Sequence, residues 1–478
     1  MAVSSVVNAT YSIETELTEK NLDQLPEFLK NNYVIQDREY RQFRSFHVSN
    51  RAVSYSVMIP ESQSQVEVTV QLTSPIMVTM RADNPLIDKK LLDSLYEDLF
   101  LLVQLFEEEV RNRNLYFAYM PGQKAVAEND KENLRLRIFK DSMLPVFVLL
   151  LASTFVLFAL LGEYAPLAMI LISLALVSVS GKLVARMADW RITPDSQEIL
   201  LFQYTLSSLE IWQLGKDFTK HTARIREKLF QSSKGGFLPL SCETASAAFS
   251  EQGITCSNEN MVVKNINVYS IVKKAADRYG LPIPRIVLVN SVVPNAAASG
   301  PNARYGTMMI TTGLLAQLDE DEVTGVVGHE MSHLKAHDPV VMAMITNVEY
   351  LIRFYIILPV IWNWGFIAFW AYFLAAMLFV YFFGKILESR ADLDSVKVLG
   401  NPKAMADALR KIGFRRMFPL NKREPQFAAF RRMEWLQFDP HPPIYFRVAQ
   451  LSKISDPKKI GNTFLKSLRD NLLGFLRA

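Results

Sequence analysis

The chain has 478 residues, half of them hydrophobic, and a formal net charge of +4. This length allows two or more domains with cores of their own, and so small a positive excess gives no reason to expect a nucleic-acid partner. Many of the hydrophobic residues stand in long runs, which indicates membrane-spanning segments rather than an entirely soluble protein.

Cysteine content and the first residues bear on the compartment. Cys242 and Cys256 are the only two cysteines, so no disulfide framework is expected and a reducing compartment is favoured. The first twenty residues contain three glutamates and no sustained apolar core. A cleaved signal peptide is therefore not expected.

Residues 1–140 have the pattern of a soluble α+β domain. Three segments alternate apolar and polar residues, as half-buried strands do: Val53–Ile59, Val66–Leu72 and Ile76–Met80. From Leu91 to Val110 the apolar residues then recur at helical spacing. Nothing in this domain suggests chemistry.

The segment Met143–Ser180 is apolar apart from Glu163. As one helix it would be about 57 Å long, almost twice the ~30 Å hydrocarbon core. The turn-like sequence Gly162–Pro166 divides it, so residues 141–186 are predicted to form a transmembrane hairpin. Lysine and arginine flank the hairpin at 135, 137, 140, 182, 186 and 191. By the positive-inside rule, both ends are expected in the cytoplasm.

Residues 187–262 are predicted to form a soluble, mainly helical insertion, and residues 263–338 a further folded domain. In the latter, the helical pattern of NVYSIVKKAADRYG is followed by a buried strand at Arg285–Val289 and a second strand at Gly306–Thr311. We expect an extended polypeptide to pair with the second strand at the edge of the sheet.

A candidate metal-binding helix begins after the acidic cluster DEDE at 319–322. His329 and His333 are four residues apart, so on a helix their imidazoles lie on one side and can bind one ion together. Glu330 lies beside them and can take a proton from a water molecule. This is the HExxH pattern of zinc hydrolases. The alternative is a pair of surface histidines on a soluble helix.

A catalytic zinc site normally has three protein ligands. His337 lies on the same helix and is interpreted as exposed or as supporting a ligand. The better candidate is Glu388, with Asp392 one helical turn later. Glu388 can bind the metal while Asp392 accepts a hydrogen bond from a ligand imidazole and fixes its orientation. Taken alone, an ExxxD pair is more often a pair of surface acids.

The apolar run Val340–Gly384 separates these two metal-binding segments. If it crossed the bilayer once, the ligands would lie on opposite sides, so we predict a second hairpin at residues 339–385. Glu349 and Arg353 lie four residues apart within it and are expected to pair or to line a polar cavity. Residues 386–478 would complete the metal-binding domain, again on the cytoplasmic side.

Several motifs together resemble the HtpX family of membrane zinc metalloproteases, which is related to the CAAX prenyl proteases. The resemblance covers about residues 265–451 and is carried by VYSIVKKAADRYGLPIPRIVLV, PNAAASG, GHEMSHLKAHD, ESRAD and HPPIYFRVAQL. It implies a zincin-type α+β metallopeptidase domain fused to about four transmembrane helices, here with an extra N-terminal α+β domain. Residues 1–140 and 197–262 have no counterpart from which a role can be carried over.

The resemblance also implies roles for residues. His329, His333 and Glu388 would bind one Zn²⁺ per chain, and Glu330 would be the general base and acid. Asn295, His441 and Arg447 would approach the substrate carbonyl and stabilise the developing oxyanion.

The expected protein is a multi-pass cell-membrane zinc endopeptidase with a cytoplasmic catalytic domain. Its partners would be the lipid bilayer and polypeptide substrates, chiefly misfolded or damaged membrane proteins. Two alternatives remain open, a CAAX-type processing protease for specific or lipidated peptides and a catalytically silent zinc-binding scaffold. The C-terminal segment Phe464–Leu473 is interpreted as ordinary terminal packing, with contact to the membrane surface as the alternative.

Overall fold

The computed structural model describes residues 7–34, 42–49, 51–59, 64–84, 87, 89–111, 113–123, 144–214, 218–235, 240–361, 365–417 and 432–477. The chain divides into two compact units. The first consists of residues 1–122, 200–264 and 417–421, and the second of residues 123–199, 265–416 and 422–478. The candidate metal-binding residues all belong to the second unit.

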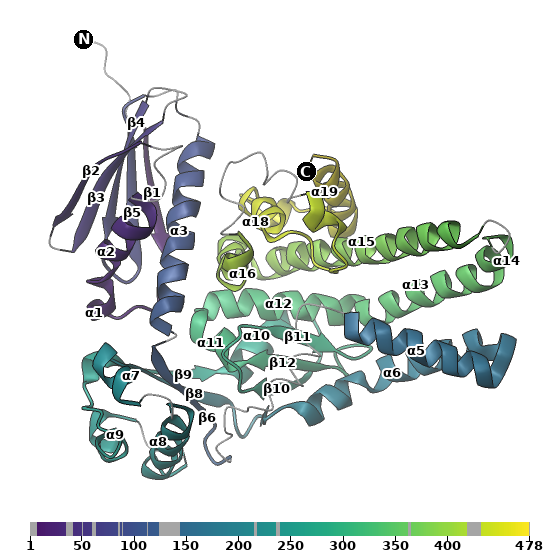
Figure 1. The fold of residues 1–478 in the computed structure, drawn as a ribbon, viewed down its shortest axis with the longest axis horizontal. Coiled ribbons are helices and arrows are strands. Elements are labelled where there is room, and N and C mark those ends of the chain that lie inside the picture. Colours follow the sequence, from purple (N-terminus) through teal and green to yellow (C-terminus); the bar gives the residue numbers. More distant parts are fainter. Residues whose placement is uncertain are drawn as a thin grey trace. The chain divides into compact units, whose positions relative to one another are not determined.

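The first unit contains a five-stranded antiparallel sheet with the strand order β1-β5-β4-β3-β2 (Figure 1). Its strands are β1 (Val7–Ile13), β2 (Gln42–Ser49), β3 (Ala52–Ile59), β4 (Ser64–Gln71) and β5 (Ile76–Ala82). The three predicted strands are confirmed as β3, β4 and β5. The strands β1 and β2 were not predicted. The sequence of β1, VNATYSI, does alternate apolar and polar residues, whereas β2 alternates less regularly and contains a register shift between Arg44 and His47.

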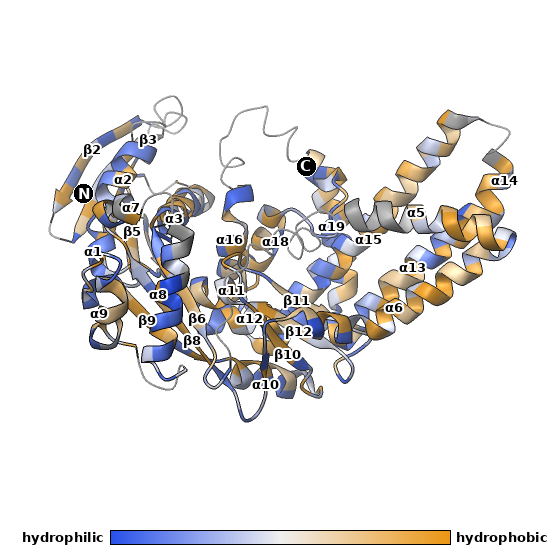
Figure 2. Ribbon diagram, turned by 60° about the horizontal axis from the view of Figure 1, so that its bottom comes forward, coloured by the Kyte–Doolittle hydropathy of each residue, from blue (hydrophilic) through white to orange (hydrophobic). Residues whose placement is uncertain are grey.

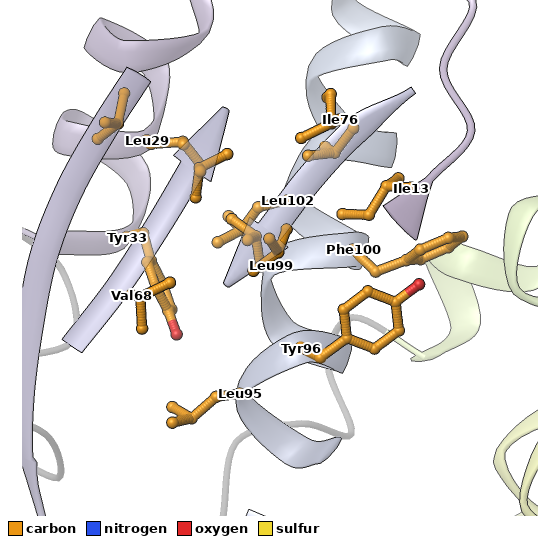
Figure 3. Packing of buried hydrophobic residues seen from close by; sticks show 14 of the residues in the cluster. Ile13, Leu29, Tyr33, Val68, Ile76, Leu95, Tyr96, Leu99, Phe100 and Leu102 are labelled. Atoms are coloured by element: carbon orange, nitrogen blue, oxygen red, sulfur yellow. The ribbon is translucent and has the colours of Figure 1, made fainter. Parts of the chain in front are cut away.

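One face of this sheet is covered by α3 (Lys89–Arg111), which confirms the predicted helix. Before it come the short helices α1 (Glu19–Leu22) and α2 (Leu25–Leu29) and the π-helix η1 (Lys30–Val34). Alternate strand residues such as Val66, Val68 and Val70 are buried in one cluster with residues of α3. Figure 3 shows Val68 together with Leu99 and Leu102 of α3. The period of two in the strands therefore supplies a continuous apolar core.

The rest of the first unit is a three-stranded sheet with helices beside it. Its elements are β6 (Asn114–Tyr119), β8 (Glu198–Thr205), β9 (Met261–Asn267), α7 (Ser208–Leu214), α8 (Phe218–Ser232), α9 (Cys242–Ser250) and the 3₁₀ turn η4 (Asn258–Asn260). Cys242 and Cys256 form a disulfide bond, which was not expected from the presence of only two cysteines. The chain turns back after α9 and brings the two Cα atoms to 5.5 Å, within the range that a disulfide requires.

The second unit is built on a four-stranded sheet with the order β11-β12-β10-β7. Its strands and neighbouring helices are β7 (Trp190–Ile192), β10 (Arg285–Val289), β11 (Ala296–Ser299), β12 (Thr307–Thr311), α10 (Val268–Tyr279), α11 (Thr312–Gln317) and α12 (Glu320–Ala336). The predicted second strand is β12, but it is not an edge strand. The irregular segment before it forms β11, which pairs antiparallel with β12 and occupies the edge.

Long apolar helices extend together from this sheet (Figures 1 and 2). They are α5 (Leu144–Leu161), the 3₁₀ turn η2 (Gly162–Tyr164), α6 (Ala165–Met187), α13 (Asp338–Ile352), the π-helix η5 (Arg353–Ile357), α14 (Leu358–Ile361) and α15 (Phe366–Leu399). Among the described residues, three helical stretches are long and apolar enough to cross a membrane: Ala152–Met187, Asp338–Val360 and Ile367–Leu399. The first contains the predicted break, where Gly162 has a φ of +57°.

Within these helices, Glu349 and Arg353 form the predicted pair. The guanidinium of Arg353 lies 3.0 Å from the Glu349 carboxylate, and both side chains are largely buried. The Tyr372 hydroxyl on α15 donates a second hydrogen bond to Glu349 at 3.3 Å. Ion pairing and this hydrogen bond satisfy groups that would be costly to bury alone in lipid.

The C-terminal part of the chain contains α16 (Pro402–Met417), α18 (Ile444–Ser452), the 3₁₀ turn η7 (Pro457–Lys459) and α19 (Thr463–Arg477). Lys411 of α16 lies 2.8 Å from the carboxylate of Glu322 in the first turn of α12, and both side chains are buried. Burial raises the pKa of Glu322 to about 7, although Lys411 opposes this. The pKa of Glu322 in the folded protein thus exceeds its ordinary value of 4.5. Between these two pH values the folded protein binds the proton more tightly than the unfolded chain, so the free energy of unfolding falls as pH rises.

We expect Lys411→Met to destabilise the protein by about 3–5 kcal/mol at pH 8, because it leaves the Glu322 carboxylate buried without its cation. The loss should be smaller at pH 6, where Glu322 can remain protonated. Thermal unfolding in detergent measures both. Lys403→Met on the same helix is the control, since Lys403 is exposed and lies 4.0 Å from Asp407. Equal shifts for the two variants would contradict the prediction.

Candidate metal centre

The helix α12 places both histidines and Glu330, and its ends are set by local sequence. At its start Asp319 and Glu322 form a capping box, in which each side chain accepts the other's backbone N–H at 2.8–2.9 Å. At its end His337 adopts the left-handed conformation, with φ of +59°, and α13 begins at the next residue. The helix α12 therefore ends directly after the HExxH turn, and α13 continues along α15, where Glu349 meets Tyr372.

Close packing of α12 against α15 brings Glu388, the third candidate metal ligand, to the two histidines. Gly328 makes this approach possible, because a Cβ atom there would lie 2.3 Å from Leu399 and 2.6 Å from the hydroxyl of Ser395. That hydroxyl donates a hydrogen bond to the backbone carbonyl of Gly325 at 2.7 Å. Side chains of α15 therefore contact the backbone of α12 directly over the turn that precedes His329.

The side chains of His329, His333 and Glu388 converge on one point. The two Nε2 atoms are 3.1 Å apart. The Glu388 carboxylate lies 3.3 Å from Nε2 of His329 through Oε2, and 3.3 Å from Nε2 of His333 through Oε1. Residues separated by the apolar segment 339–385 are thus brought together, as the sequence analysis expected.

This donor set fits a zinc ion. Ligand bonds of 2.0–2.1 Å in a tetrahedron put ligand atoms about 3.3 Å apart, and the three observed separations are 3.1, 3.3 and 3.3 Å. Oε2 of Glu388 is buried and accepts no hydrogen bond from the described part of the chain. Two imidazole nitrogens and a carboxylate are also the ligand types that zinc prefers.

Asp392 supports His329 as predicted. Its Oδ1 lies 2.8 Å from Nδ1 of His329, on the ring side opposite the donor atom Nε2. The Asp392 carboxylate is fully buried and accepts two hydrogen bonds from Arg447, each of 2.7 Å. Arg447 also lies 3.7 Å from Glu388. In this structure its guanidinium thus fixes the carboxylate that orients His329.

A matching support for His333 was missed by the sequence analysis. Oδ2 of Asp338 lies 2.6 Å from Nδ1 of His333 and accepts a hydrogen bond from Arg390 at 2.5 Å. The left-handed conformation of His337, between the two helices, makes this contact possible. A usable signal was present, because Asp338 follows the HExxH segment directly and Arg390 lies between the acidic residues Glu388 and Asp392.

Glu330 lies beside the donor set but points to the edge strand. Its Oε2 accepts a hydrogen bond of 2.6 Å from the backbone N–H of Ala298 in β11. Asn295 precedes this strand. Its backbone N–H donates to Thr311, its carbonyl accepts from the Thr311 N–H, and its side chain is exposed. The structure thus places a carboxylate between the histidine pair and the only sheet edge near it in the described chain.

His441 reaches the other side of Glu388. Its Nε2 lies 3.6 Å from the Glu388 carboxylate, and its Nδ1 lies 2.8 Å from Asp439. The fully buried Lys385 donates hydrogen bonds to the carbonyls of Gln437 and Asp439, which fixes this loop on α15. His337 is exposed, as expected, and its ring Nδ1 lies 3.2 Å from the Leu334 carbonyl.

Charge around the histidines favours a bound cation. Burial by itself would lower the pKa of His333, but the carboxylates of Glu388, Asp338 and Glu330 outweigh it and raise the pKa to about 10. Burial likewise would raise the pKa of Glu388, yet His441 and His333 hold it well below its usual range. The cluster thus attracts positive charge to the point between the donor atoms.

We expect Asp338→Asn to weaken zinc binding by about ten- to a hundredfold, because a carboxylate beside Nδ1 raises the basicity of the ligand imidazole. Titration with a competing chelator measures the affinity. Asp394→Asn is the matched control, since Asp394 binds Ser332 and Arg390 but neither histidine. An unchanged affinity for Asp338→Asn would contradict the prediction.

Comparison with known proteins shows which proteins the chain is similar to. Residues 263–455 match Peptidase family M48. A protease HtpX homolog of Thermococcus kodakarensis is 32% identical over 222 residues, which cover 40% of this chain and 73% of that protein. One of Methanothermobacter thermautotrophicus is 34% identical over 166 residues, covering 33% of this chain and 63% of that protein. The crystal structure of S. mikatae Ste24p aligns at 13% identity with a TM-score of 0.36, covering 75% of this chain and 74% of that one.

A mixed sheet and helix domain, with apolar helices of membrane-spanning length and a His-His-Glu cluster, defines a membrane protein with a candidate mononuclear metal centre. The chain belongs to the HtpX proteins of peptidase family M48. The match spans 63% of the length of the Methanothermobacter relative. Residues 1–122 lie outside the matched family region.

Proposed function

We propose that the chain is a zinc-dependent endopeptidase of the membrane, which cleaves misfolded or damaged membrane proteins and their cytoplasmic segments. The observation that carries this proposal is the convergence of three metal-donor side chains beside Glu330, on helices that continue directly into membrane-length apolar segments. His329, His333 and Glu388 would hold the zinc ion. Glu330 is not needed to bind zinc, so its presence favours catalysis over a silent scaffold.

Different residues of this chain would transfer the proton and orient the metal ligands. When bound, zinc would act as a Lewis acid and lower the pKa of a water molecule to about 7. Glu330 accepts a proton from the attacking water molecule while the water oxygen bonds to the peptide carbonyl carbon, and it then passes that proton to the departing amine nitrogen. Asp392 and Asp338 keep the two imidazoles oriented by their Nδ1 contacts throughout.

An extended substrate would add to the edge of the sheet at β11. In this position its backbone runs past Ala298 and therefore past Glu330, which accepts the Ala298 N–H. We assign His441, Arg447 and the side chain of Asn295 to the substrate carbonyl, with His441 best supported because it is half exposed beside Glu388. Arg447 is buried on Asp392 and would act mainly by holding it.

Cleavage with and without metal tests the proposal. We expect the protein purified in detergent to contain one zinc ion per chain and to cleave casein and a denatured membrane protein. Removal of zinc by a chelator should abolish both cleavages, and added Zn²⁺ should restore them. Bound zinc without any cleavage would favour the scaffold, whereas cleavage of only lipidated peptides would favour a processing protease.

The proposed topology has four crossings, with α5 and α6 as one hairpin and α13–α14 and α15 as the other, and a cytoplasmic catalytic domain. Lysine and arginine beside the hairpins support this orientation. The disulfide argues for the opposite side, because such bonds are rare in a reducing cytosol. A cysteine placed at the exposed Lys403 decides between them: an impermeant thiol reagent should leave it unlabelled in intact cells and label it after lysis.

A further inference from the structure

The helix α19 has one face that is fully used in packing. Its residues Ser467 and Asn471 are completely buried, and the Ser467 hydroxyl donates a hydrogen bond of 2.6 Å to the Ile386 carbonyl of α15. The rings of Phe464 and Phe475 contact Phe383 and Phe382 of α15, respectively. Terminal packing, as expected from the sequence, is therefore confirmed for this face.

The opposite face of α19 carries four leucines that contact solvent, with the exposed Arg469 among them. Leu465, Leu472, Leu473 and Leu476 are 61, 44, 39 and 77% exposed, respectively. Their spacing of 7, 8 and 11 residues places them on one side of the helix. Single exposed leucines are normal, but several together on a polar-rimmed helix indicate an interaction surface.

The helix α19 packs at the place where α15 leaves its apolar segment. Phe382, which touches Phe475, lies within the last residues of the predicted span. Tyr381 contacts the ring of Phe438, which is exposed together with Met433 and Leu436. The C-terminal apolar surface, consisting of residues 433, 436, 438, 465, 472, 473 and 476, is therefore continuous with a membrane-length helix.

Charges within and beside this surface are mostly positive. Lys466, Arg469 and Arg477 belong to α19, against a single acidic residue, Asp470, which is bound to the first two. Arginine and lysine beside an exposed apolar helix face are typical of helices that lie in the headgroup region of anionic lipids. A partner protein would be expected to supply acidic residues instead.

We propose that the C-terminal apolar surface lies in the headgroup–acyl boundary of an anionic phospholipid leaflet, on the side of the membrane that holds the catalytic domain. The leucines enter the boundary while the basic residues contact lipid phosphates. Since α19 is bound to α15 at Ile386, two residues before Glu388, this contact fixes the height of the metal site above the membrane. The inference depends on the membrane helices and does not require proteolytic activity.

Lipid-borne quenchers test the contact in the full-length protein. Leu472→Cys and Leu476→Cys, labelled with bimane while the native cysteines stay oxidised, are reconstituted in nanodiscs of phosphatidylcholine and phosphatidylglycerol. Brominated acyl chains should quench both labels at least twofold more than a label at Lys403→Cys, which is exposed on α16. Quenching no stronger than at the control would overturn the proposal. Disulfide cross-linking between chains at position 476 without quenching would assign the surface to a second copy.

A polar substitution provides the matched variant. Leu472→Asn/Leu476→Asn, with the label at Leu465→Cys, should reduce quenching to the control level and leave the unfolding temperature unchanged, because both side chains are exposed. Replacing phosphatidylglycerol by phosphatidylcholine should weaken the quenching of the otherwise wild-type labelled protein. Quenching that survives the double substitution would also overturn the proposal.

Discussion

Replacing Glu330 with glutamine is expected to reduce cleavage by at least about a hundredfold, the lower range for loss of a general base, while zinc content stays at the wild-type level. The amide retains the shape of the side chain but cannot accept a proton from water. Glu330 belongs to neither the three donor groups nor the carboxylates that contact their Nδ1 atoms. Metal binding and chemistry should therefore separate at this residue.

The measurement pairs metal analysis with initial rates on casein for wild type and Glu330→Gln. Glu388→Gln is the matched comparison, because it changes a carboxylate to an amide in the donor set itself and should lower zinc content as well as activity. Undiminished cleavage by Glu330→Gln would remove Glu330 from the mechanism. Loss of zinc from Glu330→Gln would instead assign it a structural role.

The geometry of the donor set was largely predictable, because helical spacing alone constrains it. His329 and His333 are four residues apart on a helix with clear start signals, so their convergence follows from the period of the helix. The contact with Glu388 required a further argument, namely that an apolar segment must return to the side from which it left. In the structure, Glu388 lies 3.3 Å from both imidazoles.

Features that depend on tertiary packing could not be predicted in the same way. Asp338 reaches His333 only because His337 adopts the left-handed conformation. The dipeptide His337-Asp338 gives no sequence signal for this conformation. The edge strand β11 has the sequence AAAS, which carries no strand pattern, and it forms because β12 offers an unpaired edge. The disulfide likewise depends on how the chain turns after α9.

Arg447→Met is expected to destabilise the fold by about 3–5 kcal/mol, because it leaves the fully buried Asp392 carboxylate without its cation and without the two hydrogen bonds from the guanidinium. Thermal unfolding in detergent measures the loss. Arg469→Met, at an exposed arginine paired with Asp470, serves as the control and should change stability by less than about 0.5 kcal/mol. Equal effects would show that the Arg447–Asp392 pair is not a stabilising element.

The double variant Asp392→Asn/Arg447→Met distinguishes the two tasks of this pair. It removes both buried charges, so most of the lost stability should return. Zinc affinity should nevertheless remain about ten- to a hundredfold below wild type, because His329 no longer has a carboxylate beside Nδ1. If Arg447 acted only on the substrate carbonyl, the single variant would keep its stability and its zinc and lose only turnover. The buried bidentate contact favours the first outcome, in which Arg447 serves the metal site through Asp392.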